Sequence, residues 1–216
     1  MNAPNAQPRR WRVQLFGGAT ISCDDQGIDL LPGHQADLVA RLALLSKPCP
    51  TEVIQDWLWP EADLETGQRR LRNLLNRLRE RAGPVVLRQG LCLRLALGAT
   101  VDVHQFRAAA LQALLANETD PSTRARLSVD ALALYSDEVL PAQLYDDWAI
   151  EARCSLAATR LALVQLLVGL LVDCGENAAA HSLAVLFEHP TEYDSTRWDS
   201  LHQKAWTERW LAGRSP

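Results

Sequence analysis

Guanidinium and carboxamide side chains crowd into one short segment of this 216-residue chain, GQRRLRNLLNRLRERAG. A guanidinium group forms paired hydrogen bonds with a phosphate or with guanine, and a carboxamide does the same with adenine. The segment therefore has the side-chain chemistry of a helix that contacts duplex DNA. The candidate DNA-binding residues within it are Arg69, Arg70, Arg72, Asn73, Asn76 and Arg77.

Apolar residues at helical spacing predict the element that would position these groups. At about 100° per residue, one face of the helix collects Leu71, Leu74, Leu75, Leu78 and Ala82. The opposite face carries Arg69, Asn73, Asn76 and Glu80, flanked by Arg72 and Arg77. The apolar face can pack against the rest of the domain while the polar face enters a groove of duplex DNA. Glu80 could accept a hydrogen bond from a cytosine amine, but an ion pair with Arg77 is the favoured interpretation.

The charge of the chain is unevenly distributed. The whole chain carries a formal net charge of -4, whereas residues 1–100 hold thirteen Lys/Arg against ten Asp/Glu, a net +3, and residues 101–216 carry -7. Between residues 66 and 94, eight arginines face the single carboxylate of Glu80. A basic stretch in an acidic protein restricts any contact with phosphate to one place.

Short strands and helices are expected before the arginine-rich segment. Residues 11–23 alternate as two strands broken at Gly17-Gly18, and a third short strand is expected at 27–30. Residues 34–46 predict a first helix that a Pro-containing break ends. A second, over 51–59, is expected to be capped by Thr51, with an inward side made of Val53, Ile54, Trp57 and Leu58.

A β-hairpin is expected directly after the arginine-rich helix, which Gly83-Pro84 ends. The sequence VVLRQGLCLRLAL alternates about a reversal at Gln89-Gly90. Arg88 and Arg94 on this hairpin are further candidate DNA-binding residues, although alternation along a strand could turn one of them to the core side. Strands, three helices and a hairpin, with the basic helix third, are the order of a winged helix-turn-helix behind a small sheet.

The second half of the chain predicts helices throughout. One helix is expected to turn apolar residues from Val103 through Leu114 inward. A second helix, after Asp120-Pro121, is expected to turn Leu127, Ala131, Leu134 and Tyr135 inward. A long helix is expected from Asp146-Asp147 to Gly175, then a shorter one over 176–189 and a last one over 194–211. The last helix would carry Trp198, Trp206 and Trp210, and an exposed apolar end there would be an association surface.

Several other classes of protein are disfavoured. Five scattered cysteines without a C-x-x-C pair argue against a disulfide framework and against a structural zinc site. No zinc-protease, P-loop, nucleophile-elbow or dinucleotide motif is present, so no catalytic, metal or cofactor residue is proposed. The apolar run over 161–174 is short for a membrane span, and the N-terminus lacks the apolar region of a signal peptide. A cytoplasmic, non-enzymatic protein is expected.

The chain also resembles a known family at the stretches already described. LPGHQADLVARLALL, GQRRLRNLLNRLR and TVDVHQF are similar to the DNA-binding domain of the SARP family of bacterial regulators, and ALALYSDEVLPAQLYDDWAIEAR is similar to that family's bacterial transcriptional activator domain. The resemblance implies a winged helix-turn-helix whose third helix reads the major groove, followed by an all-helical, TPR-like domain for partner contact.

The expected architecture is mainly α, with a winged helix-turn-helix over 10–100 and the TPR-like activator domain over 101–216. The expected function is that of a sequence-specific transcription regulator. Its expected partners are double-stranded DNA and, through the helical domain, RNA polymerase, another regulator or a second copy of the chain. The alternative is an interaction adaptor that uses the helical domain and no longer binds DNA.

Overall fold

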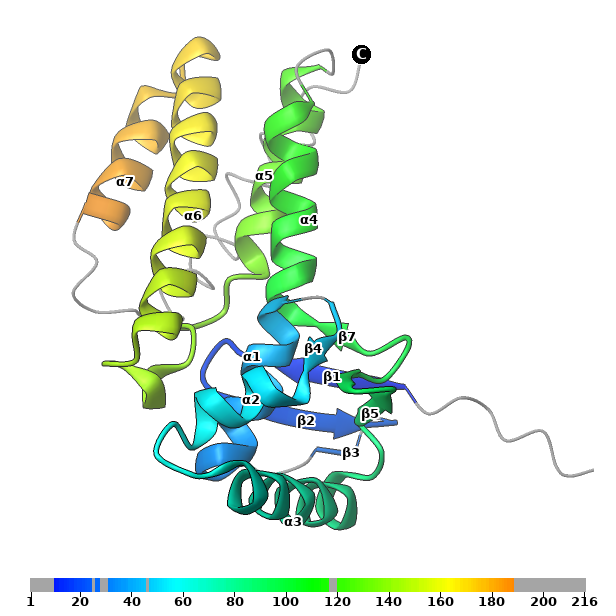
Figure 1. Ribbon diagram of the computed structural model, residues 1–216. Helices are drawn as coiled ribbons and strands as arrows, with labels where there is room; N and C mark the ends of the chain where they lie inside the picture. The colour runs from blue at the N-terminus through cyan, green and yellow to red at the C-terminus, as the bar shows by residue number, and fades with distance from the viewer. Residues whose placement is uncertain (1–9, 25, 28–30, 46, 117–119, 189–216) are drawn as a thin grey trace, which may run out of the picture. The chain divides into compact units, whose positions relative to one another are not determined.

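The computed structural model of the chain describes residues 10–24, 26–27, 31–45, 47–116 and 120–188 (Figure 1). These form two compact units, one up to Asp102, called here the N-terminal unit, and one from Val103 on, called the helical unit. The N-terminal unit combines short strands with three helices, and the helical unit is built from helices. A mainly α chain with a small N-terminal sheet and a hairpin was the predicted fold class.

Two small sheets frame the N-terminal unit. The first has the order β3-β2-β1-β7, in which β1 (Trp11–Gln14) pairs antiparallel with β2 (Thr20–Cys23) and parallel with β7 (Thr100–Val101), while β3 is Gln26–Gly27. The expected break at Gly17-Gly18 is present, since both glycines have positive φ. The second sheet has the order β4-β6-β5 and contains the predicted hairpin, β5 (Val86–Gln89) and β6 (Cys92–Leu95).

Two strands were not predicted. β4 (Cys49–Pro50) and β7 are two residues long, and each is held only by pairing with a strand far away in the sequence. The carboxylate of Asp102, which follows β7, accepts hydrogen bonds from the amides of Leu15 (2.8 Å) and Phe16 (3.0 Å). This carboxylate ties the end of the N-terminal unit back to the turn that follows β1.

Three helices pack against these sheets: α1 (Gly33–Leu45), α2 (Thr51–Leu58) and α3 (Leu64–Ala82). α1 contacts α2, α3 and β6. The predicted cap at Thr51 is wrong, because the chain enters α2 directly from β4 and the Thr51 amide donates to the carbonyl of Leu91 (2.9 Å). Val53 is also not inward, since Ile54 and Leu58 already occupy the buried side of this eight-residue helix.

The tryptophans near α2 are packing residues. Trp59 is buried and meets the ring of His34 edge-on, with 5.3 Å between ring centroids. Trp57 is half-buried beneath the guanidinium of Arg41, which lies 5.1 Å from the ring centroid. Both rings therefore contribute to packing around α2, and Trp57, which was expected on the inward side of this helix, is only partly enclosed.

The helical unit contains α4 (Asp102–Leu115), α5 (Pro121–Ala133), a short 3-10 helix η1 (Pro141–Gln143), α6 (Asp147–Asp173) and α7 (Asn177–Glu188). α6 packs against both α5 and α7. Leu134 was expected inward but is exposed, because α5 ends at Ala133 and Leu134 forms its C-cap. The helix expected over 194–211, with its three tryptophans, lies outside the described residues.

The expectation that the apolar run over 161–174 is too short for a membrane span needs correction. The helix that contains it, α6, has 27 residues and is long and apolar enough to cross a membrane by those two criteria alone. A core helix of a water-soluble domain has the same composition, and the leucines of α6 on the sides facing α5 and α7 are buried, among them Leu156, Leu163, Leu167 and Leu171.

Candidate nucleic-acid interface

Both ends of α3 are defined by specific hydrogen bonds. The Asp63 carboxylate accepts from the amide of Thr66 (2.8 Å) and from its hydroxyl (3.1 Å), and these two bonds, the amide first, lower the pKa of Asp63 below its usual range. At the other end Gly83 has a φ of 73°, and its amide donates to the carbonyl of Arg79 (2.8 Å). The helix is therefore 19 residues long, or about 28 Å.

The inner side of α3 is fixed by tight packing. Leu71, Leu78 and Ala82 are buried, while Leu74 and Leu75, expected on the same face, are half-buried at its edges. Gly67 lies against α2 so closely that an added Cβ would come 2.8 Å from the side-chain oxygen of Gln55. The absence of a side chain at Gly67 therefore allows the first turns of α3 to approach α2.

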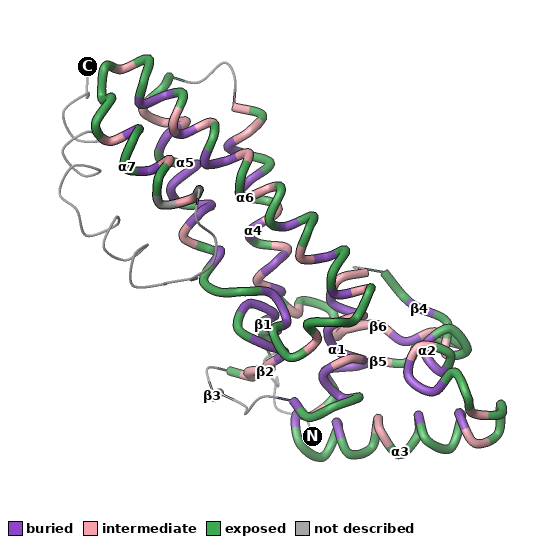
Figure 2. The backbone as a smooth tube through the Cα atoms, turned by 90° about the vertical axis from the view of Figure 1, so that its left-hand side faces the viewer, coloured by how far each residue is buried: buried purple, intermediate pink, exposed green. Residues whose placement is uncertain are grey.

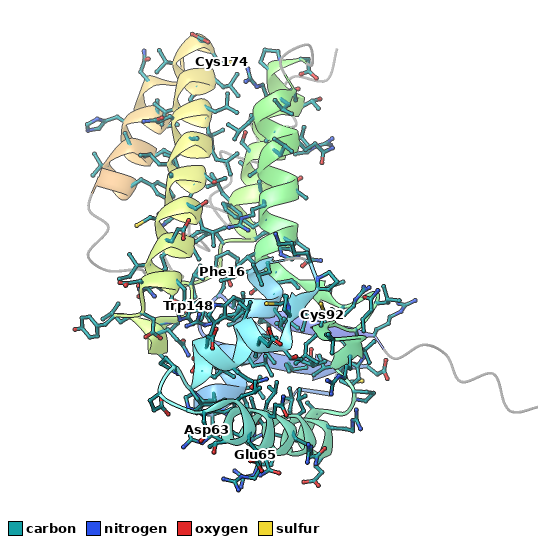
Figure 3. All side chains as sticks on the ribbon, viewed as in Figure 1. Phe16, Asp63, Glu65, Cys92, Trp148 and Cys174 are labelled. Carbon is teal, nitrogen blue, oxygen red and sulfur yellow. The ribbon has the colours of Figure 1, made fainter. Side chains whose placement is uncertain are left out.

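The outer side of α3 presents the predicted polar groups to solvent. Arg69, Arg72, Asn73, Asn76 and Arg77 are all exposed. Figure 2 shows exposed positions recurring along α3 between buried ones, and Figure 3, where Asp63 and Glu65 mark the start of the helix, shows side chains ending in nitrogen on its outer side. The ion pair expected between Glu80 and Arg77 is not formed in the described part of the chain.

Arg70 differs from the other candidates because it has an acidic partner. Its guanidinium lies 2.8 Å from the carboxylate of Glu61, in the segment between α2 and α3. A hydrogen bond from its own backbone amide and this contact with Arg70 lower the pKa of Glu61. Arg70 thus anchors the helix to the preceding segment, a role that the periodicity of the sequence did not indicate.

The hairpin separates its two arginines onto opposite faces. Arg88 stands opposite Leu93, which is buried, whereas Arg94 stands opposite Leu87 on the other face. The side chain of Arg88 is exposed and its Nε donates to the carbonyl of Gly90 (3.1 Å). Arg94 is half-buried and its Nε donates to the carbonyl of Leu95 (3.2 Å). The register therefore brings Arg88, and not Arg94, to the side on which α3 lies.

Sequence reasoning left one residue out of the candidate site. A hollow of about 340 Å³ lies between α2, α3 and the hairpin, and its lining includes Arg72, Arg79 and Arg88. Arg79 was not among the predicted DNA-binding residues. It follows Arg72 by seven residues, two helical turns, so the spacing that could have identified it was present in the sequence.

The helical unit offers a different kind of surface. Several large apolar side chains stand exposed on its helices, namely Leu111, Leu115, Leu161, Val172 and Val185. Over the described residues, no three His, Cys, Asp or Glu side chains come together as a metal site would require. The outer side of α3 provides charged and hydrogen-bonding groups, and the helices of the helical unit provide exposed apolar side chains.

Comparison with known proteins adds to this geometry. Residues 101–197 match the family described as Bacterial transcriptional activator domain. No curated protein matches the sequence. Among solved structures, Mycobacterium tuberculosis EmbR in complex with a low-affinity phosphopeptide is similar with a TM-score of 0.67 and 17% sequence identity. The match covers 96% of this chain and 56% of that chain, so this chain spans little more than half of EmbR's length.

Proposed function

We propose that this chain, a SARP-family transcriptional regulator by its activator domain and its fold, binds duplex DNA by inserting α3 into the major groove. The observation that carries the proposal is the outer face of α3, on which exposed guanidinium and carboxamide groups stand without carboxylate partners among the described residues. A major groove about 12 Å wide admits one helix, and these groups can then reach base edges.

Arrangement of the rest of the N-terminal unit supports this proposal. Buried leucines and the close approach at Gly67 hold α3 rigidly on its inner side, so binding would require little ordering of the helix. Glu61 and Asp63, which precede the helix, are engaged by Arg70 and Thr66, and Glu65 lies in its first turn. The outer face therefore keeps an excess of positive charge over most of its length.

The helical unit would contact a regulatory partner, such as RNA polymerase, another regulator or a second copy of this chain. Its exposed apolar side chains are suited to a protein partner, and its family is that of transcriptional activators. EmbR, which has a similar fold, has been solved with a phosphopeptide bound. We propose that the chain works in the cytoplasm, where bacterial DNA is accessible.

Neutralising Arg72 and Arg77 together tests the proposal. A duplex is first selected from a random pool with the full chain, and its affinity is then measured for the wild type and for the Arg72→Gln/Arg77→Gln variant. The variant should bind about tenfold or more weakly, since it lacks two guanidinium groups that reach phosphates or bases, while its thermal unfolding stays nearly unchanged.

A matched control is available in the helical unit. Arg126 is exposed on α5, and Arg126→Gln removes a positive charge without touching α3. This control should bind the duplex like the wild type. Equal binding by the double variant and the wild type would show that α3 is not the helix that reads DNA. A log-log salt slope near zero for the wild type would favour the adaptor alternative.

A further inference from the structure

A buried polar side chain at the hollow between α2, α3 and the hairpin has no hydrogen-bond partner in the described part of the chain. Gln55, on α2, lines this hollow and is only 7% exposed. Its backbone carbonyl accepts from the amide of Trp59 (2.7 Å), but no described group bonds to its carboxamide. Buried polar groups in proteins nearly always have a partner, so an unpaired carboxamide beside a hollow indicates a group that enters the hollow.

Apolar side chains line much of the same hollow. They come from α3 and from the hairpin, and they are Leu71, Leu75, Leu78, Val86, Leu91 and Leu93. Leu91, at the turn of the hairpin, is 75% exposed. A molecule with an apolar body that sits in the hollow would therefore cover an apolar side chain that otherwise faces water, which favours binding.

Three guanidinium groups from two elements complete the lining. Arg72 and Arg79 stand two turns apart on α3, and Arg88 comes from the hairpin. No described carboxylate lies within ion-pair distance of these three groups, and Glu52 provides the one carboxylate of the lining. A guanidinium group donates two parallel hydrogen bonds to a planar carboxylate. The polar part of the lining is thus suited to a carboxylate ligand.

The size of the hollow agrees with a small organic molecule. Its volume is about 340 Å³, and small-molecule sites span about 300–1,000 Å³. A simple anion such as inorganic phosphate would leave the apolar side chains uncovered. A purely apolar molecule would leave the arginines and Gln55 without partners. A carboxylate on a short apolar body satisfies both parts of the lining.

We propose that this hollow is an effector site for a small amphipathic carboxylate. The arginines hold the carboxylate, Gln55 donates to a ligand oxygen, and the leucines pack on the apolar body. Arg72 and Asn76 line the hollow and are also exposed on the outer face of α3, so a bound ligand and a DNA duplex compete. The ligand site stands on the geometry of the N-terminal unit, and its effect on DNA binding rests on the proposed function.

Titrations of the full chain followed by backbone amide NMR test the site, with octanoate as the probe. Acetate keeps the carboxylate without the alkyl chain, 1-octanol keeps the chain without the charge, and inorganic phosphate is an anion without a chain. Octanoate should shift the amide resonances of α2, α3 and the hairpin saturably. Each of the other three should bind about tenfold or more weakly, because it lacks either the charge-assisted bonds or the buried chain.

Gln55→Leu tests the buried carboxamide. The variant should bind octanoate about tenfold more weakly, since a hydrogen bond to a charged ligand group is lost. Its midpoint of thermal unfolding should stay equal or rise, because the carboxamide has no protein partner to lose. Gln105→Leu, at an exposed position of α4, is the control and should bind octanoate like the wild type. Arg79→Gln should weaken octanoate binding, whereas Arg81→Gln, outside the hollow, should not.

Filter binding with the selected duplex measures the effector role. Saturating octanoate should lower the apparent affinity of the wild type for the duplex several-fold. The same octanoate concentration should affect Gln55→Leu much less, because this variant binds octanoate weakly. Without octanoate the two proteins should bind the duplex alike, since Gln55 is buried and does not belong to the outer face of α3.

The outcomes separate this proposal from the proposed function. The site is overturned if octanoate gives no saturable shifts, or if Gln55→Leu binds octanoate like the wild type. Equally tight binding of acetate or phosphate overturns the ligand class in favour of a simple anion site, and equally tight binding of 1-octanol overturns the role of the carboxylate. Simultaneous binding of octanoate and duplex without mutual effect overturns the effector role. A wild type that binds octanoate but no duplex overturns the proposed function and supports the ligand site.

Discussion

The guanidinium of Arg70 lies 2.8 Å from the carboxylate of Glu61, nine residues earlier in the chain. This ion pair joins the segment after α2 to the second turn of α3. It also takes one arginine of the basic helix out of the set that can reach a phosphate, because a carboxylate already accepts its hydrogen bond. The number of charges in a sequence therefore overstates the number available to a polyanion.

Glu61→Gln should strengthen DNA binding. The substitution leaves Arg70 without its carboxylate partner, and the salt slope should steepen by up to about 0.9. Stability should change little, since both side chains are largely exposed to solvent. Filter binding over a salt series measures the effect. Glu151→Gln, at an exposed position of α6, is the matched control, and equal increases in affinity for both variants would contradict the specific role of Glu61.

Asn73→Ala should relax sequence preference. Asn73 stands on the outer face of α3, and a carboxamide that pairs with adenine discriminates against other bases by about 1–3 kcal/mol. Selection from a random pool with this variant should return duplexes in which one position has become degenerate. A decrease in affinity that is the same for every base at that position would show that Asn73 does not read a base.

The stability contributed by the Asp63 cap should depend on pH. The lowered pKa of Asp63 means that its carboxylate form favours the folded state, so the contribution is complete above the ordinary Asp value of about 3.9 and is lost as pH falls through the lowered pKa. Chemical denaturation of wild type and Asp63→Asn should differ at neutral pH. That difference should shrink below about pH 4; a constant difference would contradict the cap.

Arg153→Met should destabilise the helical unit. The guanidinium of Arg153 on α6 donates to the carbonyls of Leu140 (3.2 Å) and Gln143 (3.2 Å), and Leu140 has a left-handed φ of 52°. Loss of hydrogen bonds from a charged donor should cost about 2 kcal/mol or more and lower the midpoint of thermal unfolding by several degrees. Arg126→Met, at an exposed position, should have little effect. Equal midpoints for the two variants would show that the Leu140 turn does not need Arg153.

Local patterns were a good guide wherever one element supplies its own signal. Leu71 and Leu78 recur at helical spacing and are buried, and Gly83 ends α3 as its position before Pro84 suggested. The hairpin also lies where its alternation predicted. Such features depend on residues within one or two turns of each other, so their periodicity is visible without a fold.

Strands and side-chain orientations that depend on partners far away in the sequence were not predicted or were left undecided. The strands β4 and β7 are too short to show alternation and exist through pairing with β6 and β1. Val53 is exposed because Ile54 and Leu58 take the buried side of α2, and Leu134 is exposed because α5 ends one residue before it. Whether Arg88 or Arg94 faces α3 depends on the hairpin register, which alternation by itself does not specify.

By itself, the sequence determined that a basic, amphipathic helix follows two others and precedes a hairpin, because apolar spacing and Gly/Pro breaks are local properties of the chain. Only the tertiary structure decided which arginines remain available. Arg70 is engaged by Glu61, while Arg79 meets Arg72 and Arg88 at one hollow. Hydrogen bonds and electrostatic attraction act through distances of a few ångströms, and folding alone brings side chains from residues 51 to 93 within that range.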